Sequence, residues 1–176
     1  MSVVLENYER KCKLTQGRVK RAYIFPYIKY SRSQIKDFEM SLVEFPTTTI
    51  YQFDVEGSYN QNSSVEQGSF FFDQTVTLQL SEVYDVLDIH KFLKVDYRII
   101  VETYNHQLII FGVRNGLTAR VTNQTGTSKN EFNGFTLNFT GKEEKSALLI
   151  SSLEDLGFII NPENGFFDYT FDFNLS

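Results

Sequence analysis

The 176-residue sequence contains no tryptophan, one cysteine and only two histidines. Because Cys12 is alone, no intramolecular disulfide can form and a cysteine-rich metal site is excluded, so we expect synthesis in a reducing compartment. His90 and His106 have no visible partner in the sequence, and their spacing does not suggest a metal site. The missing tryptophan also removes the side chain on which sugar-binding sites often stack a ring. These absences argue against metal chemistry and weaken the case for sugar binding.

Long apolar runs and an excess of basic residues are missing too. No uninterrupted apolar stretch approaches the roughly 18 residues of a membrane-spanning helix. The opening MSVVLENYERKCK interleaves charge and has no apolar h-region, so we expect neither a cleaved secretion signal nor a membrane partner. The formal net charge is -5, which argues against a basic nucleic-acid-binding face as the main activity. Acidity is compatible with DNA that only slides past, since such a surface should not hold phosphate.

The motifs of the common enzyme classes are also missing. The sequence has no G-x-S-x-G elbow, no G-x-G-x-x-G and no Walker loop. The acidic pairs Glu143-Glu144 and Glu154-Asp155 are neighbours in sequence, which on a strand point to opposite faces and cannot flank one glycosidic bond. We therefore assign no catalytic, cofactor-binding or metal-binding residue, and we expect a protein that is not an enzyme.

What the sequence does contain is aromatic residues, 17 Phe and 10 Tyr, which favour strands. The length fits a single domain, which we place over residues 1–161, with a C-terminal strand or tail over 162–176. We predict strands in four regions. They are residues 19–32, 51–56 and 70–80, and a pair of strands hinged at Asn105-His106. In the first region Pro26 indicates a sheet edge or a bulge.

Four further features complete the predicted fold. The polar stretch 57–69 predicts a long hairpin loop, and loops of that length are usually functional or mobile. A capping serine and an apolar stripe predict one packed α-helix over 81–94. In NEFNGFTLNFTGKEE, residues 130–144, Gly134 and Gly141 act as hinges around an alternating strand. Residues 146–160 fit either a strand or a short helix stopped by Gly157.

The C-terminal segment DYTFDFNL alternates apolar and polar residues without exception, which predicts a strand with one apolar face. Such a strand satisfies its backbone only by pairing. It is either the last strand of its own sheet or an addition to the sheet edge of another chain. The apolar positions are Phe167, Tyr169, Phe171, Phe173 and Leu175.

The segment FGVRNGLTARVTNQTGTSKNEFNGFTLNFTGKEE resembles the C-terminal half of tail-tube-type virion proteins of tailed bacteriophages, including ring proteins at the neck of crAss-like phages. In these proteins a "G..NG" hairpin precedes "TG......NG.TL.F.G.E". The opening CKLTQGRVKRAYIFPY is similar to the start of such chains. The similarity covers 12–157 loosely and 111–144 best, and residues after Asn161 have no counterpart in it.

This resemblance implies a mainly β, tail-tube-like sandwich or barrel with one packed helix, and no catalytic residues. It further implies a virion structural protein made in the host bacterial cytoplasm. Its copies would form a homo-oligomeric ring between other neck or tail proteins, through which DNA passes without specific binding. We expect subunit contacts from the hairpin tip and from the C-terminal strand described above. The candidate tip residues are Tyr59, Asn60, Val65 and Glu66.

Two other hypotheses remain open at this stage. The chain could be a monomeric carbohydrate- or receptor-binding β-sandwich module that stacks its ligand on exposed Tyr23, Tyr27 or Tyr30. It could also be a hydrolase whose carboxylates are brought together only by folding. The first would remain monomeric and the second would turn over a substrate.

Overall fold

The computed structural model describes residues 18–29, 36–38, 42–44, 47–80, 90–124 and 131–160, and the predicted mainly-β class is confirmed. The described part also contains two short 3₁₀ helices, η1 (His90–Leu93) and η2 (Glu154–Leu156). The strands are β1 (Val19–Pro26), β2 (Lys36–Phe38), β3 (Leu42–Glu44), β4 (Thr48–Glu66), β5 (Ser69–Leu80), β6 (Asp96–Thr103), β7 (Leu108–Phe111), β8 (Leu117–Gln124), β9 (Gly134–Glu143), β10 (Leu148–Ile150) and β11 (Phe158–Ile160).

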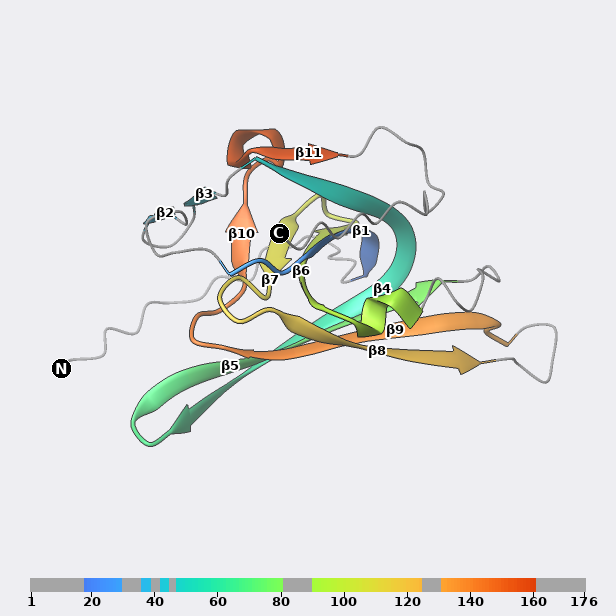
Figure 1. Cartoon of the computed structure of the whole chain (residues 1–176), viewed down its shortest axis with the longest axis horizontal. Coiled ribbons are helices and arrows are strands. Elements are labelled where there is room, and N and C mark those ends of the chain that lie inside the picture. The colour runs from blue at the N-terminus through green and yellow to red at the C-terminus, as the bar shows by residue number, and fades with distance from the viewer. Residues whose placement is uncertain are drawn as a thin grey trace, which may run out of the picture.

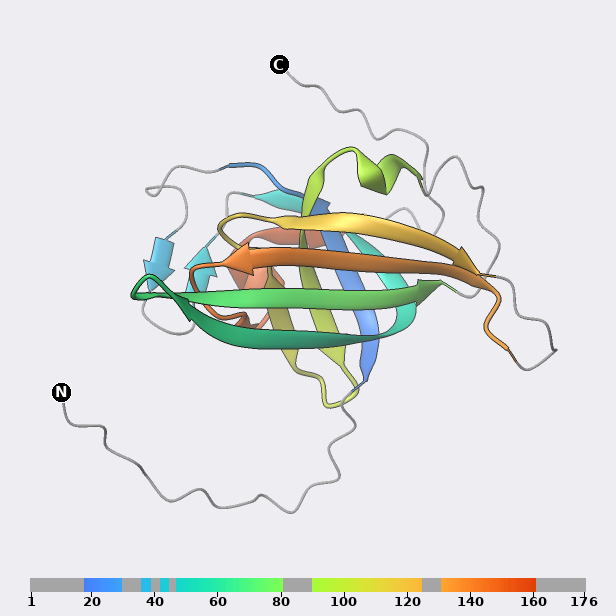
Figure 2. The same ribbon diagram turned by 90° about the horizontal axis from the view of Figure 1, so that it is seen from below.

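One large sheet has the order β1-β4-β5-β9-β8-β6-β7-β10, and β1 pairs with β6 as well as with β4. The sheet therefore closes on itself. It is folded into two layers, in which β5, β9 and β8 cross β1, β6 and β7 (Figures 1 and 2). Strand β4 belongs to both layers, because Gly57 pairs with Val19 of β1 and with Leu78 of β5. Strand β11 adds in parallel to the start of β4, and β2 and β3 form a separate hairpin.

Two apolar cores explain why some strands are apolar on both faces. The larger core lies between the layers and includes Leu78, Ile99 and Val101. A second core, on the other side of the β1-β6-β7 layer, includes Ile100 and is covered by β10, η2 and β11. Successive residues of β6 thus enter different cores, as alternation along a strand requires. The apolar run of β6 is the sequence signature of a central strand buried on both faces.

The prediction that Pro26 marks a sheet edge is wrong. Strand β1 is paired on both sides, with β4 and with β6, and its irregularity lies between Val19 and Arg21. Pro26 is the last residue of the strand, opposite Tyr97 of β6, at a level that the pairing with β4 does not reach. At that position the missing backbone N–H removes no bond from the ladder shared with β4.

The predicted helix over 81–94 is described only at its end. Residues 81–89 lie outside the described residues, and the rest forms the single turn η1. In this turn Phe92 is buried and its ring contacts those of Tyr97 and Phe139, whereas Leu93 is exposed.

The structure confirms most predicted turns. The hinge at Asn105-His106 connects β6 to β7, and His106 takes a positive φ of 59°. Gly157 ends η2 in the left-handed conformation, as predicted for residues 146–160. Gly141 is not a hinge, because it lies inside β9 at a close backbone approach. A Cβ there would lie 2.5 Å from the carbonyl oxygen of Gly116.

Candidate functional site

The stretch 57–69 does not form the predicted loop. Strands β4 and β5 continue through it and meet at a two-residue turn, Gln67-Gly68, with φ values of 50° and 82°. Positive φ at both positions is the pattern of the tight hairpin turn that matches strand twist. Polar residues continue the strands here because cross-strand backbone hydrogen bonds need no apolar side chains. The hairpin projects beyond the two layers (Figure 1), and we call its residues 58–73 the arm.

One face of the arm is mainly apolar, with Gln61 and Ser63 as polar exceptions, and it is uncovered at the tip. Along β5 the alternate residues Phe70, Phe72, Val76 and Leu78 share a face, and this face is the one that lines the core between the layers. Beyond the core the same face is exposed to solvent. There Phe70 is paired with Val65 across the hairpin, and their exposed fractions are 68% and 62%. The face of the sheet that lines the core therefore continues along the arm, where the second layer no longer covers it.

The backbone of the arm also has an unpaired edge. Strand β1 pairs with β4 only as far as Gly57, while β5 pairs with β4 as far as Glu66. Among the described residues, positions 58–66 thus have a strand partner on one edge only. Every second residue of such a strand directs its N–H and C=O outward, where another strand can bind them. A second unpaired edge lies on β8, whose residues 119–124 pair only with β9 in the described part of the chain.

The outward face of β4, β5, β9 and β8 is built mainly from hydroxyl and amide side chains. The pairings align them in rows across the four strands. The charged exceptions are Glu56, Glu66, Asp73, Arg120 and Lys142, of which Lys142 pairs with Glu66. This broad polar face therefore carries charges of both signs and no basic cluster. Its hydroxyl and amide residues are Ser58, Asn60 and Asn62 on β4, Thr75 and Thr77 on β5, Thr136, Asn138 and Thr140 on β9, and Thr118 and Thr122 on β8.

Two glutamines fix the root of the arm to the body. The Gln74 side chain is buried, accepts a hydrogen bond from Gly112 N at 3.0 Å and donates to Gln61 Oε1 at 3.2 Å and to the Lys145 carbonyl at 3.3 Å. Gln61 Oε1 also accepts from Ala147 N at 2.7 Å. Because both side chains bond backbone groups near β7 and β10, they fix the root of the arm relative to the other layer.

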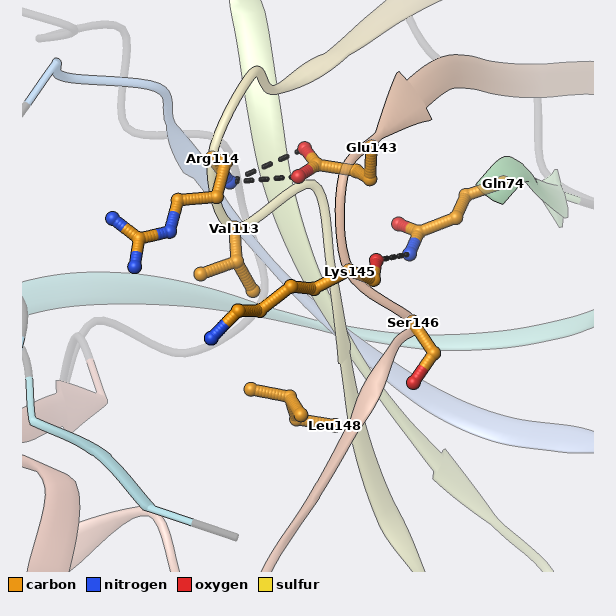
Figure 3. Close-up of a pocket in the computed structure, with 7 residues that line it drawn as sticks. All are labelled: Gln74, Val113, Arg114, Glu143, Lys145, Ser146 and Leu148. Atoms are coloured by element: carbon orange, nitrogen blue, oxygen red, sulfur yellow. Dashed lines mark hydrogen bonds between the residues drawn. The ribbon is translucent and has the colours of Figure 1, made fainter. Parts of the chain in front are cut away.

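Glu143, buried at 1% exposure, organises the turn between β7 and β8. Its carboxylate accepts the backbone N–H groups of three successive residues, Arg114, Asn115 and Gly116, at 2.8 to 3.2 Å. Figure 3 shows the bonds from Arg114. Burial raises the pKa of Glu143, against the opposing effect of these hydrogen bonds and of the Arg98 charge. The backbone N–H groups of this turn could bind an anion, and the Glu143 carboxylate occupies that position.

Arg98 supports the same turn from the opposite side. It is 1% exposed and donates from Nε to the Val113 carbonyl at 3.1 Å and from Nη2 to the Ile28 carbonyl at 2.8 Å. The guanidinium lies 4.4 Å from the centre of the Tyr27 ring, whose hydroxyl donates to the Arg114 carbonyl. The cavity beside this network, at Gln74 and Val113 (Figure 3), holds about 10 Å³, the space of about one water molecule. This network is built to hold the fold, and no substrate fits into it.

A second cluster of charges lies on the surface. Arg21 binds Asp54 at 2.7 Å and Glu102 at 3.4 Å, and the Asp54 hydrogen bond raises the pKa of the guanidinium. His106 lies 3.4 Å from the other oxygen of Glu102. Beside this cluster an open groove of about 430 Å³ is lined by residues including Tyr104 and Phe132. Within the described ranges, no three His, Cys, Asp or Glu side chains gather as a metal site would require.

The structure describes four of the nine predicted contact residues. Tyr59, Asn60, Val65 and Glu66 all lie on the arm, and Tyr59 packs against Phe111 at a ring distance of 5.3 Å. The tail positions Phe167, Tyr169, Phe171, Phe173 and Leu175 lie outside the described residues, as do Cys12 and Tyr30.

Of the tyrosines proposed for a monomeric binding module, the two that the structure describes, Tyr23 and Tyr27, do not form an exposed stacking face. Tyr23 is buried, and Tyr27 is half-buried under Arg98. Sequence reasoning also missed the Gln61-Gln74 pair. One signal was available, because Gln74 is the polar exception in the apolar alternation from Phe70 to Leu80.

No family model, no curated protein and no solved structure matches this chain. In the part that the structure describes, no helix has the length and apolar character needed to cross a lipid bilayer. The arm, its unpaired edge and the polar face are therefore the features on which a functional proposal has to rest.

Proposed function

We propose that this chain is a virion structural protein, one subunit of a ring in the neck or tail of a tailed bacteriophage. The observation that carries the proposal is the arm, whose apolar face and backbone edge are both uncovered beyond the core. Exposed apolar side chains at the end of a projecting sheet mark a surface for another protein. The sequence resemblance to tail-tube-type proteins indicates which kind of assembly that surface serves.

Ring closure needs two different surfaces on each subunit, because a head-to-tail contact joins unlike patches. The layer formed by β4, β5, β9 and β8 offers this arrangement. One unpaired edge lies at β4 and the other at β8, on opposite sides of the same layer. Each copy would cover an edge of the next, which also removes the aggregation hazard of open edges.

The polar face of this layer is suited to line a channel for DNA. Most of its side chains are threonine, serine and asparagine, which exchange hydrogen bonds with water and carry no charge. Lysine and arginine clusters bind phosphate by releasing counterions, and this face has no such cluster. With a net charge of -5, the subunit would let DNA pass without binding it specifically. Other neck or tail proteins would contact the ring above and below.

The test is the mass and shape of the purified full-length chain, measured by light scattering and negative-stain imaging. The proposal predicts annular objects with a central hole, formed by the protein alone or on particles that contain it. A chain that stays monomeric under all conditions and is absent from particles would contradict it.

One observation favours a second candidate, a monomeric carbohydrate- or receptor-binding module. The open groove exposes Tyr104 beside Asp54 and Glu56, which could stack and hydrogen-bond a sugar ring. Binding of a glycan panel by a monomeric chain, lost in Tyr104→Ala, would favour this function over the ring.

A further inference from the structure

We infer that the unpaired edge of the arm receives the C-terminal strand, residues 167–175, of a second copy of this chain. This inference rests on the proposed ring assembly and names the contact that holds it together. Its basis is the fit between the edge and the strand in length, in alternation and in side-chain chemistry.

The lengths agree to within one residue. The unpaired edge covers residues 58–66 of β4 and the alternating tail segment covers residues 167–175. With odd residues opposite odd, residues 167–174 lie opposite 65–58, and Leu175 comes level with Gly57, where the pairing of β4 with β1 begins. The tail alternates so that its odd-numbered residues are apolar. On β4 the odd-numbered residues, such as Tyr59 and Val65, lie on the inner face with Phe70 and Val76. Pairing odd with odd places both apolar faces on the same side of the sheet.

The space that such a strand would enter is bordered by apolar groups. Tyr59 packs against Phe111, which lies on the inner face of the opposite layer. Leu149 of β10 pairs with Ile109 and so shares that inner face, yet its exposed fraction is 56%. An added strand with phenylalanines on its inner face would cover Tyr59 and Leu149 together.

Charge and hydrogen bonding select one register for an antiparallel strand. Placing Phe167 opposite Val65 brings Phe173 opposite Tyr59 and the Asp168 carboxylate beside Ser64. The Ser64 hydroxyl is buried and has no hydrogen-bond partner among the described residues. A shift of two residues would instead place Asp168 opposite Glu66, and like charges directly opposite each other destabilise a sheet.

The tail of the same chain cannot reach this position in the antiparallel sense. Its strand would have to begin beside Glu66, at the end of the arm. The chain leaves the described part at Ile160 in β11, which lies at the top of the molecule in Figure 1, whereas the hairpin turn lies at the lower left. Residues 161–166 span at most about 24 Å, whereas the arm edge alone is about 30 Å long. A strand in this antiparallel register therefore comes from another copy.

Cysteine cross-linking of the full-length chain tests the contact. In a Cys12→Ser background, Asn62→Cys is combined with Thr170→Cys, which the chosen register places opposite each other on the outward face. Directly opposed cysteines are within disulfide distance. Mild oxidation should shift the chain from monomer to multimer bands on a non-reducing gel, and reduction should reverse the shift. The matched control, Ser63→Cys with Thr170→Cys, places the thiols on opposite faces and should remain monomeric.

The outcomes separate this contact from the ring itself. Oligomers seen by light scattering without cross-links, or cross-links equally strong in the control, would overturn the strand exchange while leaving the ring proposal standing. A disulfide within one chain would overturn it as well, because the tail would then pair with its own arm. If no oligomer forms at any concentration and particles lack the chain, both proposals fail. Cross-links from Asn62→Cys to Asp172→Cys alone would overturn the register.

Discussion

Replacing Phe70 by alanine should separate assembly from folding. Its side chain is 68% exposed in the subunit, so the fold depends little on it. The main loss to the subunit is the cross-strand pair with Val65, worth about 0.2–1 kcal/mol. If a neighbouring subunit covers the arm in the assembled ring, the exposed two thirds of the Phe70 side chain become buried in that contact. Since full burial of a phenylalanine is worth about 1.5–3 kcal/mol, the contact should lose about 1–2 kcal/mol.

That loss corresponds to an association constant about 5- to 30-fold weaker per contact. Sedimentation across a concentration series measures the association, and urea unfolding measures the subunit. The control is Ile28→Ala, which removes a side chain of similar exposure, 55%, away from the arm. We expect it to leave association unchanged. Equal association by Phe70→Ala and the unaltered chain would refute the assignment of the arm as a subunit contact.

Three further predictions concern the fold that positions the arm. Gln74→Leu should cost about 1–3 kcal/mol in urea unfolding, because the Gly112 N–H loses its buried acceptor; an unchanged midpoint would contradict this. Gly57→Ala should lower the melting temperature, because a Cβ at position 57 would lie 2.3 Å from the Thr77 carbonyl oxygen. A melting temperature equal to that of the unaltered chain would show that position 57 tolerates a side chain. Because burial raises the pKa of Glu143 in the folded state, its contribution to stability should improve as pH falls from neutral through that pKa and level off below about 4.5. The unfolding free energy relative to Glu143→Gln, measured from pH 7 to pH 4, should follow this trend, and a decrease with acidification would reverse the sign we assign.

Local pattern predicted the strands and several turns well. The alternation of Phe135, Leu137 and Phe139 placed one face of β9 in the core, and all three are buried. Gly157 ended its helix as expected because a left-handed residue favours glycine. Such features depend on neighbours in sequence, so the sequence alone was sufficient.

Features that depend on distant pairing were missed. The polar composition of 57–69 suggested a loop, but strand pairing with β5 overrides composition where backbone bonds are the main constraint. The closure of the sheet through β1 and β6 could not be predicted, since these strands are far apart in sequence. For the same reason the Glu143 turn was invisible, because its donors come from a segment about 28 residues earlier in the chain.

The most direct test of the central claim, that uncovered edges are completed by further copies, is negative-stain imaging of the purified full-length chain and of particles that contain it. We expect rings with a central opening in which every subunit contacts two neighbours. Isolated single subunits at all concentrations, and particles without this chain, would contradict it.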